Sequence, residues 1–230
     1  MKIFIAGLGT GNPNLITLEA INTAKISDVI LFPCSKENKS KGVAEKILLN
    51  FVKPQKFFRI FFPMIKNSNE RDKIIFNQII EIKSEIENSS KIFFPVIGDS
   101  LLYSTGAYLI EAMRKIFPDV EVDFIPGISA HSLAAACAKK FLAMSDEILT
   151  VIPGTAEPEK ILNALKSSDT VAIYKPKAVK DLKSIVKNVC SWKKIFRIDC
   201  AGIPDKEKIY EGYEALENIN EYLSIIILWR

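Results

Sequence analysis

Short apolar runs alternate with amphipathic stretches over the whole chain of 230 residues. A short apolar run bounded by glycine, proline or charged residues is typical of a buried β-strand. In chain order the runs are KIFIAGL (2–8), DVILFP (28–33), FFRIFFP (57–63), KIFFPVIGD (91–99), EVDFIPG (121–127), EILTVIPG (147–154), DTVAIYK (169–175), KIFRID (194–199) and EYLSIIILWR (221–230). This order predicts strands and helices that follow each other along the chain.

The stretches between the runs show a helical period, most clearly at 16–27 and 70–87. In the second of these, isoleucines recur at spacings of three and four, which places them on one stripe of a helix. They are Ile75, Ile79, Ile82 and Ile86. We therefore expect an amphipathic helix whose isoleucine stripe faces the core.

The predicted strands are apolar on both faces, which is typical of a mostly parallel sheet covered by helices on both sides. The fold class is therefore α/β. About ten strand candidates exceed the four to six of a usual sheet, so we divide the chain near Pro126-Gly127 into domains 1–125 and 126–230. Because the last strand candidate ends the sequence, it has to insert into a sheet that other strands form.

Three glycine-bearing turns follow predicted strands, at 7–13, 98–106 and 126–129. In an open α/β sheet the ligand crevice lies outside the carboxyl ends of the strands, so these turns can converge on one site. The first turn, GLGTGNP, is weak evidence for a dinucleotide site, because it lacks the third glycine and an acidic ribose partner. A tight turn that needs positive φ explains its glycines equally well.

Polar side chains gather in the second and third turns. Asp99 follows a buried strand and is either a turn or capping residue or a ligand for a cationic group. Because Ser104 and Thr105 can cap the helix expected at 106–115, we favour a functional role for Asp99. Ser129 is expected to cap the next helix, whose backbone N–H groups can also hold a carboxylate. Tyr103 fits either a core or a cleft-lining position.

Other chemistries find little support in the sequence. The four cysteines show no C-x-x-C spacing, which favours reduced thiols in a cytosol over zinc ligands or disulfides. The single histidine, His131, belongs to no catalytic triad, and metal and P-loop motifs are absent. The amino-terminal apolar stretch is too short for a membrane span and lacks a signal-peptide cleavage region. We expect a soluble, cytoplasmic protein without a metal.

The net charge of +4 is spread over scattered lysines, which suits an anionic small molecule as well as it suits nucleic acid. A polar loop at 35–42 contains Lys36, Lys39 and Lys41. These lysines are candidates for binding an anionic ligand, although a solvated, mobile loop is the simpler interpretation.

Four segments together resemble the tetrapyrrole (corrin/porphyrin) methyltransferases. The segments lie at 7–31, 96–115, 120–155 and 199–212, so the resemblance runs through both predicted domains. Within the family, GDSLLYST, PGISAHSLAAA and AMSDEILTVIPGT are most similar to the precorrin-2 or cobalt-factor II carbon-20 methyltransferases of cobalamin biosynthesis. The resemblance implies two α/β domains with a cleft between them, a homodimer, S-adenosylmethionine as the methyl donor and a tetrapyrrole as the substrate, without nucleic acid or membrane partners.

The resemblance also implies roles for particular residues. Those implied for the cofactor are Gly98, Asp99, Leu102, Tyr103, Ser104, Thr105, Ile128, Ser129, Tyr174, Lys175, Ala201 and Gly202, and those implied for the substrate are Gly9, Thr10, Gly11, Asn12 and His131. Asp99 would pair with the charged groups of the cofactor. Water, Asp99 or Tyr103 could remove the proton from the methylated carbon.

The chain departs from the family pattern at three places. Gly9-Thr10-Gly11-Asn12-Pro13 stands where G-P-G-D-P is usual, so a role that needs a carboxylate at Asn12 is in doubt. Ser100 replaces the usual proline, and His131 the usual bulky residue. The alternatives are a family member that methylates another tetrapyrrole carbon, RNA or protein, and a cofactor-binding module without catalysis.

Overall fold

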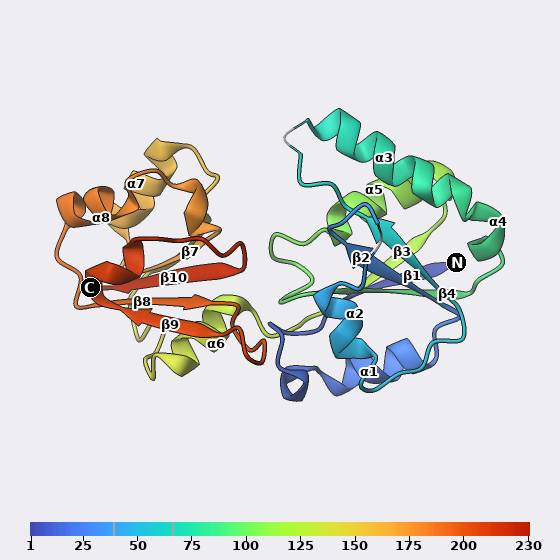
Figure 1. The fold of residues 1–230 in the computed structure, drawn as a ribbon, viewed down its shortest axis with the longest axis horizontal. Helices are drawn as coiled ribbons and strands as arrows, with labels where there is room; N and C mark the ends of the chain where they lie inside the picture. The colour runs from blue at the N-terminus through green and yellow to red at the C-terminus, as the bar shows by residue number, and fades with distance from the viewer. Residues whose placement is uncertain (39, 66) are drawn as a thin grey trace. The chain divides into compact units, whose positions relative to one another are not determined.

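The computed structural model describes residues 1–38, 40–65 and 67–230. These residues form two compact units, Met1–Ser129 and Ala130–Arg230. Each unit contains one five-stranded sheet with helices on both of its faces (Figure 1).

The first unit is a parallel α/β unit. Its elements are β1 (Lys2–Gly7), η1 (Pro13–Leu15), α1 (Leu18–Lys25), β2 (Val29–Cys34), α2 (Val43–Leu48), β3 (Phe57–Phe61), α3 (Ser68–Glu81), α4 (Lys83–Ile86), β4 (Lys91–Val96), α5 (Gly106–Ile116) and β5 (Glu121–Ile125). The strand order is β3-β2-β4-β1-β5, and all neighbours pair in parallel. The α/β class expected from the sequence is confirmed.

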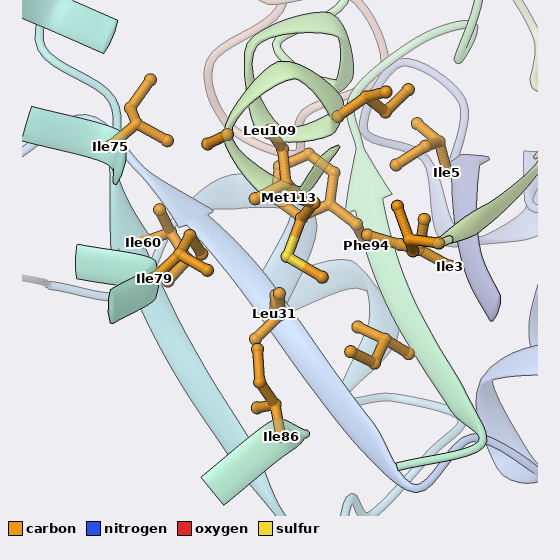
Figure 2. Close-up of a cluster of buried hydrophobic side chains, with 14 of the residues drawn as sticks. Ile3, Ile5, Leu31, Ile60, Ile75, Ile79, Ile86, Phe94, Leu109 and Met113 are labelled. Atoms are coloured by element: carbon orange, nitrogen blue, oxygen red, sulfur yellow. The ribbon is translucent and has the colours of Figure 1, made fainter. Parts of the chain in front are cut away.

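Two apolar cores cover the two faces of this sheet. In β1, Ile3 and Ile5 face one core, whereas Ala6 faces the other, because successive side chains of a strand point to opposite faces. Figure 2 shows the first core, in which side chains of α3, α4 and α5 pack over β1, β2 and β4. Helices α1 and α2 cover the opposite face (Figure 1).

The expected isoleucine stripe exists, but its helix is divided. Ile75, Ile79 and Ile86 are fully buried, and Ile82 packs against the same core. At Ile82 the backbone leaves the helical region, with φ −102° and ψ 8°, so α3 ends and the short α4 begins. The stripe therefore continues across a break that the spacing did not predict.

The second unit is mixed. Its elements are α6 (Ala130–Cys137), β6 (Leu149–Pro153), α7 (Pro158–Ser167), β7 (Thr170–Tyr174), η2 (Pro176–Ala178), α8 (Leu182–Val189), β8 (Lys194–Asp199), β9 (Lys208–Glu211), η3 (Gly212–Leu216) and β10 (Ser224–Trp229). The strand order is β6-β7-β10-β8-β9, in which β6 and β7 are parallel and the other pairs are antiparallel.

The last strand, β10, inserts between other strands and is the centre of the second sheet. Every residue of β10 is buried, and the strand pairs antiparallel with both β7 and β8. β7 and β8 therefore run in the same direction and end at the same edge. The edge strand β9, which is largely polar and exposed, lies outside the apolar runs of the sequence.

Two charged side chains are enclosed together in the second unit. Arg197 of β8 is 1% exposed, and its Nη1 donates to the carbonyl oxygens of Ala215 at 2.9 Å and Glu217 at 2.6 Å. Its Nε lies 3.2 Å from Oδ1 of the equally buried Asp199. This arginine ties η3 to the sheet and supplies donors to carbonyl groups that the end of η3 leaves unpaired.

Among the described residues, no helix combines the length and the apolar character that crossing a membrane requires.

Candidate functional site

The ends of β1 and β4 are joined beyond the parallel ladder. Gly98 N–H donates to Gly9 O at 2.6 Å, and Gly9 N–H donates to Gly98 O at 3.2 Å, which forms an antiparallel bridge. Both glycines have a left-handed backbone, with φ +73° at Gly9 and +75° at Gly98. The chain therefore changes direction at Gly9 and at Gly98, and the two turns lie against each other.

The third turn packs directly on this bridge. A Cβ at Gly127 would lie 2.3 Å from Gly98 O and 2.6 Å from the carbonyl carbon of Gly7. A Cβ at Gly7 would lie 2.5 Å from Gly98 O. These short distances show that the three turns meet at one edge of the sheet. Their backbones can approach so closely because glycine has no side chain. This contact also explains why the first unit extends to Ser129, four residues beyond the boundary expected after residue 125.

Gly98 differs from the other two glycines in what surrounds it. Apart from its chain neighbours, no heavy atom of the described residues lies within 4 Å of the place its Cβ would take. The space beside the Gly98 backbone is therefore open, and a side chain at this position would fill it.

The turn after β4 is organised by its own side chains. Asp99 Oδ1 accepts a hydrogen bond from Leu101 N–H at 2.8 Å, so the expected turn role is present. Ser104 Oγ accepts from Gly106 N–H at 3.0 Å, whereas the side chain of Thr105, the residue before α5, makes no capping bond.

Tyr103 projects from this turn with a left-handed backbone at φ +51°, and 42% of the residue is exposed. Burial of the remainder raises the pKa of the Tyr103 phenol above its ordinary value near 10. The phenol is therefore protonated at neutral pH, and Tyr103 is better suited to donate a hydrogen bond than to accept a proton.

Two buried hydroxyl groups beside the bridge have no hydrogen-bond partner in the described part of the chain. They are Oγ1 of Thr10, which is 5% exposed, and Oγ of Ser100, which is 2% exposed. An unpaired buried hydroxyl costs stability, so such groups are often kept for a ligand or a water molecule. Nearby, Asn12 is occupied with structure, since its Oδ1 accepts from Asn14 N–H at 2.9 Å at the start of η1.

The other expected site residues belong to the second unit, at the edge where β7 and β8 end. In the register with β10, Tyr174 pairs with Ile225 and Asp199 with Ser224. Two strand spacings of about 4.8 Å therefore separate the ends of β7 and β8. Lys175 and Gly202 follow these ends with left-handed backbones, at φ +52° and +72°.

The same edge holds a pair of rings that the sequence did not predict. Tyr174 Oη lies 2.9 Å from Nδ1 of His131 and accepts from His131 N–H at 3.3 Å. Each residue was a candidate, but 43 positions separate them and no local pattern connects them.

The remaining candidates are distributed over both units. In the first unit Ile128 is 37% exposed and Ser129 is buried, while in the second unit Ala201 is buried and Gly202 N–H donates to Glu207 Oε2 at 2.6 Å. Lys36 and Lys41 are exposed, and Lys39 lies outside the described residues.

The described residues contain no group of three or more side chains suited to hold a metal ion. Burial raises the pKa values of the Cys137 and Cys200 thiols, which disfavours the reactive thiolate. The arrangement instead offers backbone groups, hydroxyls and one carboxylate, which suit the binding of a polar small molecule.

The family model of the tetrapyrrole (corrin/porphyrin) methylases matches residues 2–213. Since this match includes most of the chain, the chain belongs to that family. It is 29% identical over 231 residues to a probable cobalt-precorrin-2 C(20)-methyltransferase of Methanocaldococcus jannaschii, covering 100% of this chain and 96% of the relative. It is 26% identical over 175 residues to a cobalt-precorrin-2 C(20)-methyltransferase of Salmonella typhimurium, covering 76% and 72%.

Solved structures share the fold. A cobalt precorrin-4 methyltransferase superposes with a TM-score of 0.69 at 19% identity, covering 99% of this chain and 94% of the other. The uroporphyrin-III C-methyltransferase of Thermus thermophilus, in complex with S-adenosylhomocysteine, gives a TM-score of 0.67 at 16% identity and covers 100% and 98%. The tetrapyrrole methylase fold expected from the sequence is therefore confirmed.

The close packing of the glycines predicts unequal effects of two matched substitutions. We expect Gly127→Ala to lower the free energy of unfolding by about 3 kcal/mol or more, the upper end of overpacking, because its Cβ would lie within 2.7 Å of backbone atoms that cannot rotate away. Gly98→Ala should cost only the left-handed backbone strain, about 1–2 kcal/mol. Urea unfolding of both variants measures the difference, and equal losses would contradict the packing described.

The unpaired hydroxyls predict opposite effects of two serine substitutions in one turn. Ser100→Ala should leave the free energy of unfolding of the ligand-free protein unchanged or raise it by up to about 1 kcal/mol, since it removes an unsatisfied buried group. Ser104→Ala should lower it by about 0.5–1.5 kcal/mol, because Gly106 N–H loses its acceptor. Thermal and urea unfolding distinguish the two, and a loss of stability in Ser100→Ala would show that its hydroxyl already has a partner.

Proposed function

We propose that this tetrapyrrole methylase transfers a methyl group from S-adenosylmethionine to the carbon-20 meso position of precorrin-2 or cobalt-factor II, in cobalamin biosynthesis. The observation that carries the proposal is the meeting of the three glycine turns, where Gly98 is open and the nearby hydroxyls of Thr10 and Ser100 are unpaired. The choice of carbon 20 is supported by the relative from Methanocaldococcus jannaschii, which aligns with the whole chain. The proposal includes a homodimer, as the family resemblance implies, and a cytoplasmic location, which the spacing of the cysteines favours.

The residues at the turns suit the methyl donor. S-adenosylmethionine supplies an electrophilic methyl group on a sulfonium, together with an ammonium and a carboxylate. Asp99 carries the negative charge that such cationic groups require, and its Oδ1 is held in place by Leu101 N–H. Backbone N–H groups and hydroxyls of the turns would bind the carboxylate and ribose. The family resemblance assigns Tyr174, Lys175, Ala201 and Gly202 of the second unit to the cofactor as well.

The protein contributes to the reaction mainly by holding the two reactants in the right orientation. An activated methyl group needs a nucleophilic carbon held in line with it and water kept away, which rigid turns at strand ends can provide. Gly9, Thr10, Gly11 and His131 are assigned to the tetrapyrrole, whereas Asn12 contributes through its turn.

After transfer, the meso carbon has to lose a proton. The raised pKa of Tyr103 leaves Asp99 or a water molecule as the better acceptor at neutral pH. Tyr103, a residue that is 42% exposed, would then lie beside the reacting carbon as a protonated phenol.

The function is tested directly by methyl transfer from radiolabelled S-adenosylmethionine under anaerobic conditions. We expect one added methyl on precorrin-2 or on cobalt-factor II, located at carbon 20 by mass spectrometry and NMR of the pigment. Uroporphyrinogen III is a necessary third arm, because a uroporphyrinogen-III C-methyltransferase of Cyanidium caldarium is 27% identical over 203 residues. Transfer to uroporphyrinogen III alone would overturn the carbon-20 assignment and keep the family.

The role of Asp99 is tested by Asp99→Asn, which keeps an oxygen for Leu101 N–H but removes the charge. We expect the Kd for S-adenosylmethionine to rise about ten- to a hundredfold, the size of a lost charge-assisted hydrogen bond. Unfolding should change little. Asp119→Asn, on an exposed turn outside the site, is the matched control, and calorimetric titration gives both values. Equal affinities for the two variants would remove Asp99 from the cofactor site.

A further inference from the structure

Helices α3 and α5 lie side by side over one face of the first sheet (Figure 1). A helix that follows a parallel strand begins where that strand ends, so α3 and α5 begin at the edge of the sheet where the glycine turns meet. Their first turns are in contact, because the guanidinium of Arg71 covers the ring of Tyr108, with Cζ 3.8 Å from the ring centroid. Tyr108 is about 3 Å along the helix axis from Gly106, which follows the second glycine turn. Arg71 therefore belongs to the same edge as these turns.

The guanidinium of Arg71 is held in one orientation by its neighbours. Its Nε donates to Asp72 Oδ1 at 2.9 Å, and its Nη2 lies 2.8 Å from the same oxygen. Tyr108 covers one face of the guanidinium, whose positive charge is attracted to the aromatic ring. A guanidinium that is already oriented loses less conformational entropy when it binds a further ligand.

Part of this guanidinium is available to a ligand. It has five N–H donors, of which Asp72 takes those of Nε and one of Nη2. The Nη1 group has no acceptor among the described residues, and the side chain of Arg71 is 18% exposed. The planar pair of Nη groups matches the two oxygens of a carboxylate. Because Asp72 already balances the charge of Arg71, a second carboxylate would gain mainly from directed hydrogen bonds.

Two large apolar residues at this edge are exposed to water. Met64 follows β3 and Leu101 follows β4, and each residue is 63% exposed. Apolar side chains at the same edge as an oriented cation suit a ligand that has an apolar body and acidic arms. A tetrapyrrole has both features, because carboxylate arms surround its ring system.

We propose that Arg71 binds a carboxylate arm of the tetrapyrrole, and that Leu101 and Met64 contact its ring system. The inference rests on the proposed function, which supplies the class of substrate. All three residues belong to the first unit, and the family resemblance assigns none of them to the site. Arg71 would therefore act on the affinity for the substrate and not on the affinity for the cofactor.

Arg71 is tested by Arg71→Gln and Arg71→Lys, with Arg114→Gln in the exposed last turn of α5 as the matched control. We expect the KM for the tetrapyrrole that is methylated to rise about tenfold in Arg71→Gln, the size of a lost hydrogen bond to a charged group. Arg71→Lys keeps the charge without the paired donors, so its KM should rise less. The kcat and the Kd for S-adenosylhomocysteine should keep their wild-type values in all three variants. A purely structural role of Arg71 would lower the stability and leave the KM unchanged.

The apolar contact is tested by Leu101→Ser, which changes an exposed side chain and leaves the core intact. We expect the KM for the tetrapyrrole to rise about three- to tenfold, because the ligand no longer removes the leucine surface from water. The matched control is Ile26→Ser, at the end of α1 that lies away from this edge, where the isoleucine is 60% exposed. The KM of this control should keep its wild-type value.

Binding of uroporphyrin III, followed by its fluorescence, separates this inference from the proposed function, because it requires no methyl transfer. We expect its Kd to rise in Arg71→Gln and Leu101→Ser and to stay the same in the two controls. An unchanged KM and Kd in Arg71→Gln would overturn the role of Arg71, even in an enzyme that methylates precorrin-2. A wild-type protein that methylates none of the three tetrapyrroles would overturn the proposed function, while uroporphyrin III binding would still decide the role of Arg71. If Arg71→Gln fails to fold, Arg71→Lys and Leu101→Ser provide the test.

Discussion

The close approach of three backbone segments, at Gly7, Gly98 and Gly127, is the constraint on which the first unit depends. A methyl group at Gly7 or Gly127 would lie within 2.8 Å of backbone atoms, which have no rotamer to change. Because β1 is paired with both β4 and β5, the ends of these strands are already side by side. Because the glycines have no side chains, the turns after these strands can also come into contact. The polar residues that follow the strands therefore lie at one edge of the sheet.

The same packing explains how a site can form from turns and still be rigid. The antiparallel bridge between Gly9 and Gly98 adds two hydrogen bonds beyond the ladder, and Asp99 and Ser104 each satisfy a backbone N–H in the second turn. By contrast, the buried hydroxyl groups of Thr10 and Ser100 have no hydrogen-bond partner among the described residues. Unsatisfied buried hydroxyl groups lower the stability of the protein, and a ligand that binds them can restore it.

The second unit positions its polar groups through a central antiparallel strand. β10 lies between β7 and β8, so both of these strands run in one direction and end together. Arg197 and Asp199 then occupy the interior beside η3, and Tyr174 reaches His131 at the start of α6. The fold is shared with other tetrapyrrole methylases, so the fold alone does not specify a substrate.

The sequence by itself determined the α/β class, nine of the strands, the isoleucine stripe and the convergence of three turns, because these follow from local periodicity and from the parallel direction of the strands. The tertiary structure alone decided the break at Ile82, the polar edge strand β9, the burial of Arg197 and the contact of His131 with Tyr174. The contacts of Arg197 and of His131 join residues 18 to 43 positions apart, so they are set by packing and are not visible in the local pattern. The hydroxyls of Thr10 and Ser100 show the same difference, since their residue types are visible in the sequence, whereas their lack of a partner in the described part of the chain is a property of the folded protein.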